Sequence, residues 1–168
     1  MDFDVIGDQR VINEQDRVFL RRCIELATSA LAAGDAPFGS VLVSSGGDIL
    51  FEDRNRISSG DHTQHPEFSI ARWAAENMTP KDRLQATVYT SGEHCPMCAA
   101  AHGWVGLGRI VYASSSKQLS AWLAELGVPS SRVRPLPIED VIADTQVDGP
   151  DDELSAQVHQ LHIKRHSA

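Results

Sequence analysis

Residues 86–113, ATVYTSGEHCPMCAAAHGWVGLGRIVYA, decide the fold that we predict for this chain. The two ends of this stretch, Ala86–Thr90 and Arg109–Ala113, are rich in β-branched and aromatic residues, which is typical of strands. The Ala-rich stretch Pro96–Val105 between them is typical of a helix. A strand, a helix and a second strand in this order predict an α/β fold with a partly parallel sheet.

The segments on either side continue this alternation of strands and helices. The spacing of apolar residues predicts a helix over residues 13–33, and Gly46-Gly47 between two apolar runs predicts an antiparallel hairpin. The further elements that we expect are a helix beginning at Pro66, a helix around Leu119–Leu126, a weak fifth strand over Arg132–Leu136, a loop over Asp144–Glu153 and a short C-terminal helix over Leu154–Leu161. The sequence thus predicts a three-layer α-β-α sandwich with a five-stranded mixed sheet.

Length and composition indicate an ordinary globular protein. The chain has 168 residues, of which 42% are hydrophobic and 23% charged, and a net charge of −8, so we expect a single domain over residues 1–168. The negative charge disfavours binding to nucleic-acid backbones. No apolar stretch reaches the roughly 20 residues of a membrane helix, and the start, Met1–Asp4, lacks the pattern of a signal peptide. We therefore expect a cytoplasmic protein that binds neither nucleic acid nor membranes.

Three residues form a candidate metal site: His65, Cys95 and Cys98. Two cysteines three residues apart at a predicted helix start share one helix face, and the positive end of the helix dipole favours their thiolate form. His65 also lies at a predicted helix start. One histidine and two cysteines leave the fourth position of a zinc ion open, which is typical of catalytic zinc. Glu67, two residues after His65, is placed to carry protons from water to a departing amine.

His65-Pro66-Glu67 and Cys95-Pro96-Met97-Cys98 together resemble the two halves of the zinc signature of the cytidine deaminase superfamily. Their order and spacing match, and the similarity covers about residues 13–136, which leaves an acidic loop and a helix over residues 144–168 outside it. The resemblance implies a cytidine deaminase-like fold with one zinc ion per subunit. It implies that the histidine and the two cysteines bind the zinc and that Glu67 is catalytic. It also implies a homodimer.

Two further features are similar to the branch of this superfamily that acts on free bases and includes guanine deaminases. They are Pro37-Phe38-Gly39, before the expected hairpin, and Asn55, at its end. The resemblance implies that Asn55 hydrogen-bonds the substrate ring and that Phe38 lies near it. The chain departs from the family at two positions: His94 stands where proline is usual, and Pro66 stands where alanine often offers its N–H to the substrate. We count both among the candidate substrate-binding residues.

The function that we expect is zinc-dependent hydrolytic deamination of a small nucleobase-like heterocycle, such as guanine, cytosine or a related purine or triazine. A nucleoside deaminase and a tRNA adenosine deaminase are alternatives with a similar signature. An alternative of another class is a CxxC redox protein, in which Cys95 and Cys98 form a reversible disulfide. For the neighbouring residues we expect Glu93 to orient the metal loop through hydrogen bonds, His62 to be exposed, His102 to be buried or to face a partner, and Trp104 to lie in the core or at a dimer interface.

Overall fold

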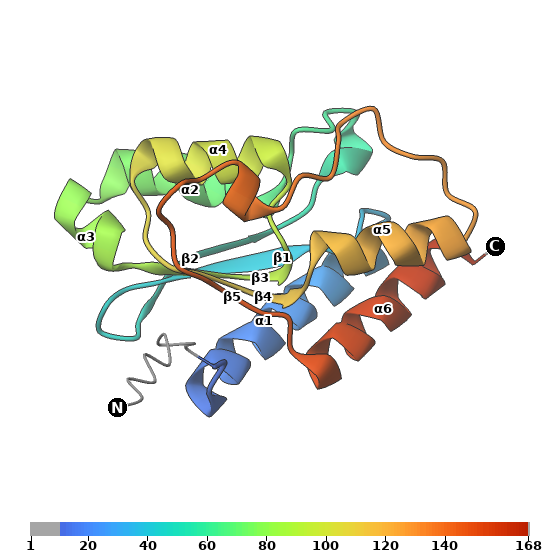
Figure 1. The fold of residues 1–168 in the computed structure, drawn as a ribbon, viewed down its shortest axis with the longest axis horizontal. Helices are drawn as coiled ribbons and strands as arrows, with labels where there is room; N and C mark the ends of the chain where they lie inside the picture. The colour runs from blue at the N-terminus through green and yellow to red at the C-terminus, as the bar shows by residue number, and fades with distance from the viewer. Residues whose placement is uncertain (1–10, 168) are drawn as a thin grey trace, which may run out of the picture.

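The computed structural model describes residues 11–167, so the expectation for Met1–Asp4 lies outside the described residues. The sheet lies between two sets of helices (Figure 1). No helix of residues 11–167 combines the length and the hydrophobicity that a membrane span requires. The predicted fold class, an α-β-α sandwich with a five-stranded mixed sheet, is confirmed.

The helices and strands follow the predicted order closely. Asn13 caps the first helix in a capping box with Asp16, and the predicted helix Pro96–Val105 has the predicted bounds. Within the described residues the elements are α1 (Glu14–Ala32), β1 (Gly39–Val43), β2 (Ile49–Arg54), η1 (Ile57–Ser59), α2 (Pro66–Asn77), α3 (Pro80–Gln85), β3 (Thr87–Gly92), α4 (Pro96–Val105), β4 (Ile110–Ser114), α5 (Ser116–Glu125), η2 (Ile138–Asp140), β5 (Val147–Asp148) and α6 (Asp152–His166).

The sheet has the strand order β2-β1-β3-β4-β5. The strand β1 pairs antiparallel with both β2 and β3, whereas β4 pairs parallel with β3 and β5. The hairpin and the partly parallel sheet are therefore confirmed. In the register of β1 with β3, Ser40 lies directly opposite Thr90. This pairing brings together two polar residues that are 50 positions apart in the sequence.

The predicted position of the fifth strand is wrong. Arg132–Leu136 is exposed and forms no strand, and the fifth strand is Val147–Asp148, inside the segment predicted to be a loop. Pro135 removes a backbone donor that a sheet ladder needs. The strand β5 exists because it pairs with β4, where the Ile110 N–H also donates to the Gln146 carbonyl over 2.9 Å. A two-residue strand carries no periodic pattern, so only its partner reveals it.

The short helix α3 is a second difference from the sequence prediction. It begins at Pro80, directly after Thr79, whose side chain accepts a hydrogen bond from the Asp82 N–H. A threonine cap followed by proline at the first helical position is a known start signal. Six residues are too few to show helical periodicity, so the cap was the one available indication.

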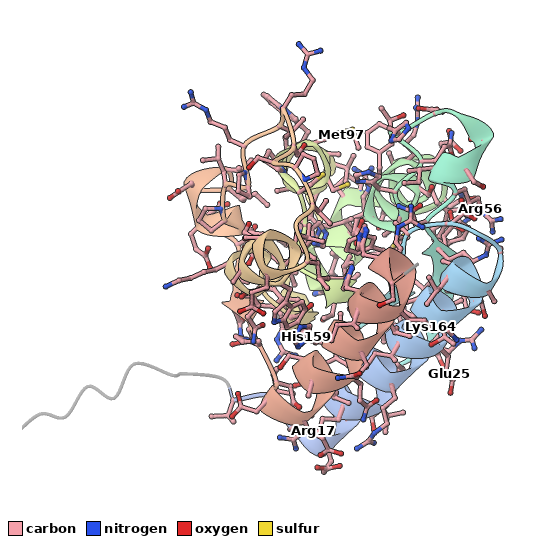
Figure 2. The ribbon with its side chains drawn as sticks, turned by 90° about the vertical axis from the view of Figure 1, so that its right-hand side faces the viewer. Arg17, Glu25, Arg56, Met97, His159 and Lys164 are labelled. Carbon is pink, nitrogen blue, oxygen red and sulfur yellow. The ribbon has the colours of Figure 1, made fainter. Side chains whose placement is uncertain are left out.

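Apolar side chains fill the space on both faces of the sheet. On one face, α1 and α6 bury a cluster that includes Phe19, Leu20 and Val158. On the other face, α2 buries Ile70 and α4 buries Ala99. Figure 2 shows α6 lying along α1, with the labelled Lys164 and His159 on α6. The helices α2 and α4 are thus fixed side by side on one face of the sheet (Figure 1).

A buried ion pair joins the start of α1 to the sheet. The Arg109 guanidinium donates to both carboxylate oxygens of Asp16 over 2.9 and 3.1 Å, and to Asp148 over 2.8 Å. The Tyr89 hydroxyl donates to Asp16 over 2.8 Å. Burial by itself would raise the pKa of Asp16, but the hydrogen bonds from Arg109, the Asn13 backbone and Tyr89 outweigh it and lower that pKa. Asp16 is therefore ionised in the folded protein at neutral pH.

We expect Asp16→Asn to lower the free energy of unfolding by about 2 kcal/mol at pH 7, because buried hydrogen bonds to a charged group are lost. A lowered carboxyl pKa stabilises the fold above the unfolded pKa, and this contribution disappears as the pH falls through the folded pKa, which lies below 3.8. Urea unfolding of both proteins should therefore show a difference that shrinks between pH 5 and about pH 3. Glu14→Gln, at an exposed ion pair, is the control, with an expected effect below about 1 kcal/mol. An equal loss for both variants contradicts the prediction.

Candidate active site

Two helix starts bring the predicted metal ligands together. His65 is the residue that precedes α2, and Pro66 is the first residue of that helix. Cys95 precedes α4 in the same way, before Pro96, and Cys98 lies in the first turn. Because proline has no N–H to lose at the first helical position, it favours a helix start there. The side-by-side packing of α2 and α4 places both starts at one point.

The distances between the ligand atoms fit a zinc ion. The His65 Nδ1 atom lies 3.5 Å from the Cys95 Sγ and 3.6 Å from the Cys98 Sγ. All three ligand atoms lie within 4.8 Å of one another. Tetrahedral zinc with Zn–N of about 2.0 Å and Zn–S of about 2.3 Å requires a nitrogen-to-sulfur separation of about 3.5 Å. The His/Cys/Cys group therefore has both the chemistry and the spacing of a zinc site.

The electrostatics of the group also favour a metal. Hydrogen bonds from Cys98 and His65 lower the pKa of Cys95 to about 4, against the opposing effect of burial. The hydrogen bond to Cys95 and burial raise the pKa of Cys98, and the bond to Cys95 raises the pKa of His65. One sulfur therefore carries a negative charge at neutral pH. Zinc binds thiolate, so the group is partly in the form that the metal requires.

Glu67 lies in the first turn of α2, beside the group of metal ligands, and is only 5% exposed. Its Oε1 atom accepts hydrogen bonds from the Thr90 hydroxyl over 2.7 Å and from the Ser40 hydroxyl over 3.0 Å. Burial raises the pKa of Glu67, and the bond from Thr90 and the charge of His65 oppose this. A carboxyl group with a raised pKa takes up and releases protons more readily near neutral pH.

Asn55 and Phe38 are in direct contact through the backbone. The Asn55 N–H donates to the Phe38 carbonyl over 3.0 Å, and the Asn55 side-chain oxygen accepts from the Ile57 N–H over 3.1 Å. The other side-chain atom of Asn55, Nδ2, has no protein partner within residues 11–167. The Phe38 ring lies against Gly92, where a Cβ atom would come within 3.2 Å of it. Phe38 thus packs against the end of β3, three residues before Cys95.

Pro66 and His94 differ in how they relate to the site. Pro66 is buried and begins α2 between the metal ligand and Glu67. The His94 ring is 1% exposed and meets the His102 ring edge-on, with 5.4 Å between the ring centres. Both ring nitrogens of His94 lack a hydrogen-bond partner. The structure therefore places His94 inside the protein against α4, and outside the group of metal ligands formed by the described residues.

The remaining neighbours behave as expected. His62 is exposed, and His102 is buried with its Nε2 donating to the Gly108 carbonyl over 2.7 Å. The Glu93 carboxylate accepts from the Ser116 N–H over 2.9 Å and from the Ile138 N–H over 2.8 Å. Glu93 thus holds the metal loop to the start of α5 and to the start of η2. Its predicted role as a hydrogen-bonding support of that loop agrees with these contacts.

The sequence analysis missed Ser40 and Thr90, which contact Glu67, and His162, which contacts Phe38. The His162 ring on α6 lies edge-on to the Phe38 ring, with 5.2 Å between the ring centres. Hydroxyl-bearing residues within predicted strands are the only signal that sequence offers for the first two, because buried hydroxyls require a partner. Nothing in the sequence connects His162 to Phe38.

Comparison with known proteins places these residues in a family context. The model of the cytidine and deoxycytidylate deaminase zinc-binding region matches residues 13–114. A Schizosaccharomyces pombe protein named probable cytosine deaminase is 32% identical over 64% of this chain and 65% of its own. A tRNA-specific adenosine deaminase from Haemophilus influenzae is 34% identical over 67% of this chain and 65% of its own. This chain thus spans about two thirds of the length of each of these two relatives.

Guanine deaminase from Bacillus subtilis matches over a longer range. It is 29% identical over 88% of this chain and 86% of its own length. A solved structure of guanine deaminase from Bacillus subtilis has a TM-score of 0.55 at 27% identity and covers 93% of this chain and 96% of that chain. The similarity to this protein therefore extends beyond residue 114 into the C-terminal segment.

Proposed function

Because this chain belongs to the family of cytidine and deoxycytidylate deaminases, whose zinc-binding region it contains, we propose that it removes the amino group of a free nucleobase or a similar small heterocycle by hydrolysis and releases ammonia. The observation that carries the proposal is the separation of 3.5 and 3.6 Å between the His65 nitrogen and the two sulfurs. Those separations fit zinc, and buried Glu67 follows two residues after the histidine.

His65, Cys95 and Cys98 would hold the zinc ion, one per chain. When bound there, zinc would act as a Lewis acid that makes water a nucleophile at neutral pH. Glu67 takes a proton from the attacking water and delivers protons to the ring nitrogen and to the departing amine. The ring carbon gains the oxygen of water and loses its amino group, which leaves as ammonia with one added proton. The products are thus the oxo form of the ring and one molecule of ammonia.

The substrate residues complete this proposal. Asn55 would offer its unpaired Nδ2 to the ring, and the Phe38 ring beside Gly92 would form one wall of the site. Pro66, which has no N–H, cannot donate to a substrate carbonyl through its backbone. His94 would act through its packing against α4, since its ring is buried. A CxxC redox protein has no need of His65 or Glu67, so the site as a whole favours the deaminase.

Two observations favour a free base over tRNA. The match to guanine deaminase covers 88% of this chain, and the net charge of −8 disfavours a polyanionic substrate. The matched tRNA-specific adenosine deaminase makes tRNA the second candidate. Deamination of tRNA should weaken as salt is raised, because binding releases counterions, whereas deamination of a neutral base should not.

A substrate panel tests the proposal. The zinc-loaded protein is incubated separately with each compound of the panel, and ammonia is measured at low and high salt. The panel consists of guanine, cytosine, adenine, their nucleosides, an aminotriazine and tRNA. We expect turnover of at least one free base, independent of salt. If only tRNA is turned over, and more weakly at high salt, tRNA replaces the free base as the substrate. A metal-free protein with a reversible Cys95–Cys98 disulfide overturns the proposal.

We further propose that the chain forms one domain and acts as a homodimer that uses the outer face of α4. Met97, Ala100, Ala101 and Trp104 recur at intervals of three and four, so they share one face of the helix, and all are at least partly exposed. Trp104 is 89% exposed. An apolar helix face with a largely exposed tryptophan is typical of a protein interface. A cytoplasmic location stays a prediction.

Light scattering should give a mass of twice 18.3 kDa for the wild type. We expect Trp104→Glu to shift the protein to a monomer, because burying an unpaired carboxylate in an interface is unfavourable. Val18→Glu is the matched control, since Val18 is also an exposed apolar residue but lies on α1. A monomeric wild type, or a dimer that survives Trp104→Glu, contradicts this assignment.

A further inference from the structure

Two hydroxyl groups hold one oxygen of Glu67. The Oε1 atom accepts from Thr90 over 2.7 Å and from Ser40 over 3.0 Å. The two hydroxyls also contact each other over 2.9 Å. Within residues 11–167, no side chain donates to the other carboxyl oxygen, Oε2, and it is not among the fully buried polar atoms that lack a partner. The backbone N–H of Glu67 itself also hydrogen-bonds to the carboxyl group. The two oxygens of Glu67 are therefore in different surroundings, since two side-chain hydroxyls hold Oε1 and none holds Oε2.

The sheet itself produces this arrangement. Ser40 on β1 and Thr90 on β3 are directly opposite each other in the antiparallel register, so their side chains point to the same face. That face is covered by α2, which carries Glu67. Both residues are completely buried. A buried hydroxyl loses its hydrogen bonds to water, so such a pair is retained only where partners are present.

The hydroxyls do not depend on Glu67 for their hydrogen bonds. Thr90 Oγ1 also lies 2.8 Å from the Gly92 carbonyl, and Ser40 can donate to Thr90. Each hydroxyl has a single proton, so a chain from Ser40 to Thr90 to Gly92 is an alternative to donation to Oε1, and it satisfies both hydroxyl protons without the carboxyl group. Oε1 of Glu67, in contrast, has no other side-chain donor within the described residues. Oε1 of Glu67 therefore needs the two hydroxyls as hydrogen-bond donors, whereas the hydroxyls do not need Glu67 as an acceptor. This is the relation expected of residues that position the carboxyl group.

We propose that Ser40 and Thr90 are positioning residues that anchor the Glu67 carboxyl by Oε1 and so leave Oε2 as the oxygen that takes and delivers the proton. This inference rests on the proposed function, because it concerns the proton-carrying role of Glu67. The two hydroxyls fix the rotation of the carboxyl group about its last bond, which sp²-terminated side chains otherwise leave broad. A carboxyl held in one orientation presents Oε2 correctly in every turnover.

Isosteric variants test the proposal. Thr90→Val removes the hydroxyl and keeps the shape, and we expect it to lower kcat by about 10- to 100-fold, because a misplaced catalytic group has an effect of that size. KM should stay within about threefold, since substrate binding is not touched. Thr90→Ser keeps the hydroxyl and should recover most of kcat. A role in folding alone would not produce that recovery together with unchanged zinc content and an unchanged KM.

The double variant and a matched control sharpen the test. Ser40→Ala should lower kcat by about 5- to 20-fold, and Ser40→Ala with Thr90→Val should lose less than the product of the single losses, because both hydroxyls act on one oxygen. The control is Ser114→Ala on β4. Its hydroxyl is equally buried but donates to the Ser91 carbonyl over 2.8 Å. We expect kcat of that variant to stay within about twofold of wild type.

The outcomes separate this inference from the proposed function. If the wild type releases ammonia, Glu67→Gln does not and Thr90→Val retains full kcat, the inference is overturned and the function stands. If the wild type releases no ammonia from any compound of the panel, the proposed function fails. In that case crystal structures decide the inference: a Glu67 carboxyl that keeps its orientation in Thr90→Val overturns it, and a rotated carboxyl supports it.

Discussion

Glu67→Gln should lower kcat for ammonia release by about 10³-fold, because general acid–base catalysis contributes on that scale. Glutamine has nearly the same size and accepts hydrogen bonds from Ser40 and Thr90 through its side-chain oxygen, but it cannot carry a proton. The side chain is buried beside the metal ligands, and the structure offers no second carboxyl in the first turn of α2. Steady-state kinetics with ammonia as the readout measure the effect.

Two further measurements make this prediction specific. Zinc content of Glu67→Gln should equal that of the wild type, because the residue is not one of the three grouped ligands. Glu76→Gln, an exposed change on the same helix, should keep wild-type kcat. A Glu67→Gln variant with more than about a tenth of wild-type kcat would remove Glu67 from the proton-transfer role.

Cys98→Ala should abolish zinc binding and ammonia release together. Cys98 is completely buried, and its sulfur is one of only three ligand atoms in the group, so its loss leaves two. A bound metal stabilises the folded state that contains its site, and this contribution disappears with the metal. We therefore expect less than about 0.1 zinc per chain and a lower melting temperature. Metal analysis and thermal unfolding measure the two effects.

A chelator and a matched cysteine provide the controls. Chelation should lower the melting temperature of the wild type and leave that of Cys98→Ala unchanged. Cys23→Ala removes another fully buried thiol, on α1, that is outside the metal group. That variant should keep its zinc and lose about 1–2 kcal/mol of stability through packing alone. Full zinc content in Cys98→Ala contradicts the proposed ligand set.

Much of the fold is predictable because its signals are local. The capping residue Asn13, proline at the first position of α2 and α4, and the glycine turn between β1 and β2 act within a few residues of themselves. The spacing of Cys95 and Cys98 is set by a single helical turn. The His/Cys/Cys group is predictable for the same reason, since each half of the motif begins a helix that its own sequence specifies.

The residues that the sequence did not reveal depend on partners far along the chain. The strand β5 exists through its pairing with β4, and His162 meets Phe38 from a helix more than a hundred residues later.

The sequence by itself determined which side chains can bind zinc and carry a proton, because ligand type and helix starts are properties of short segments. Only the tertiary structure decided how Glu67 is held. Ser40 and Thr90 meet because β1 and β3 pair in one register, and a shift of one residue would turn one of the two side chains to the other face of the sheet. Strand register is a property of the assembled sheet, so no short segment encodes it.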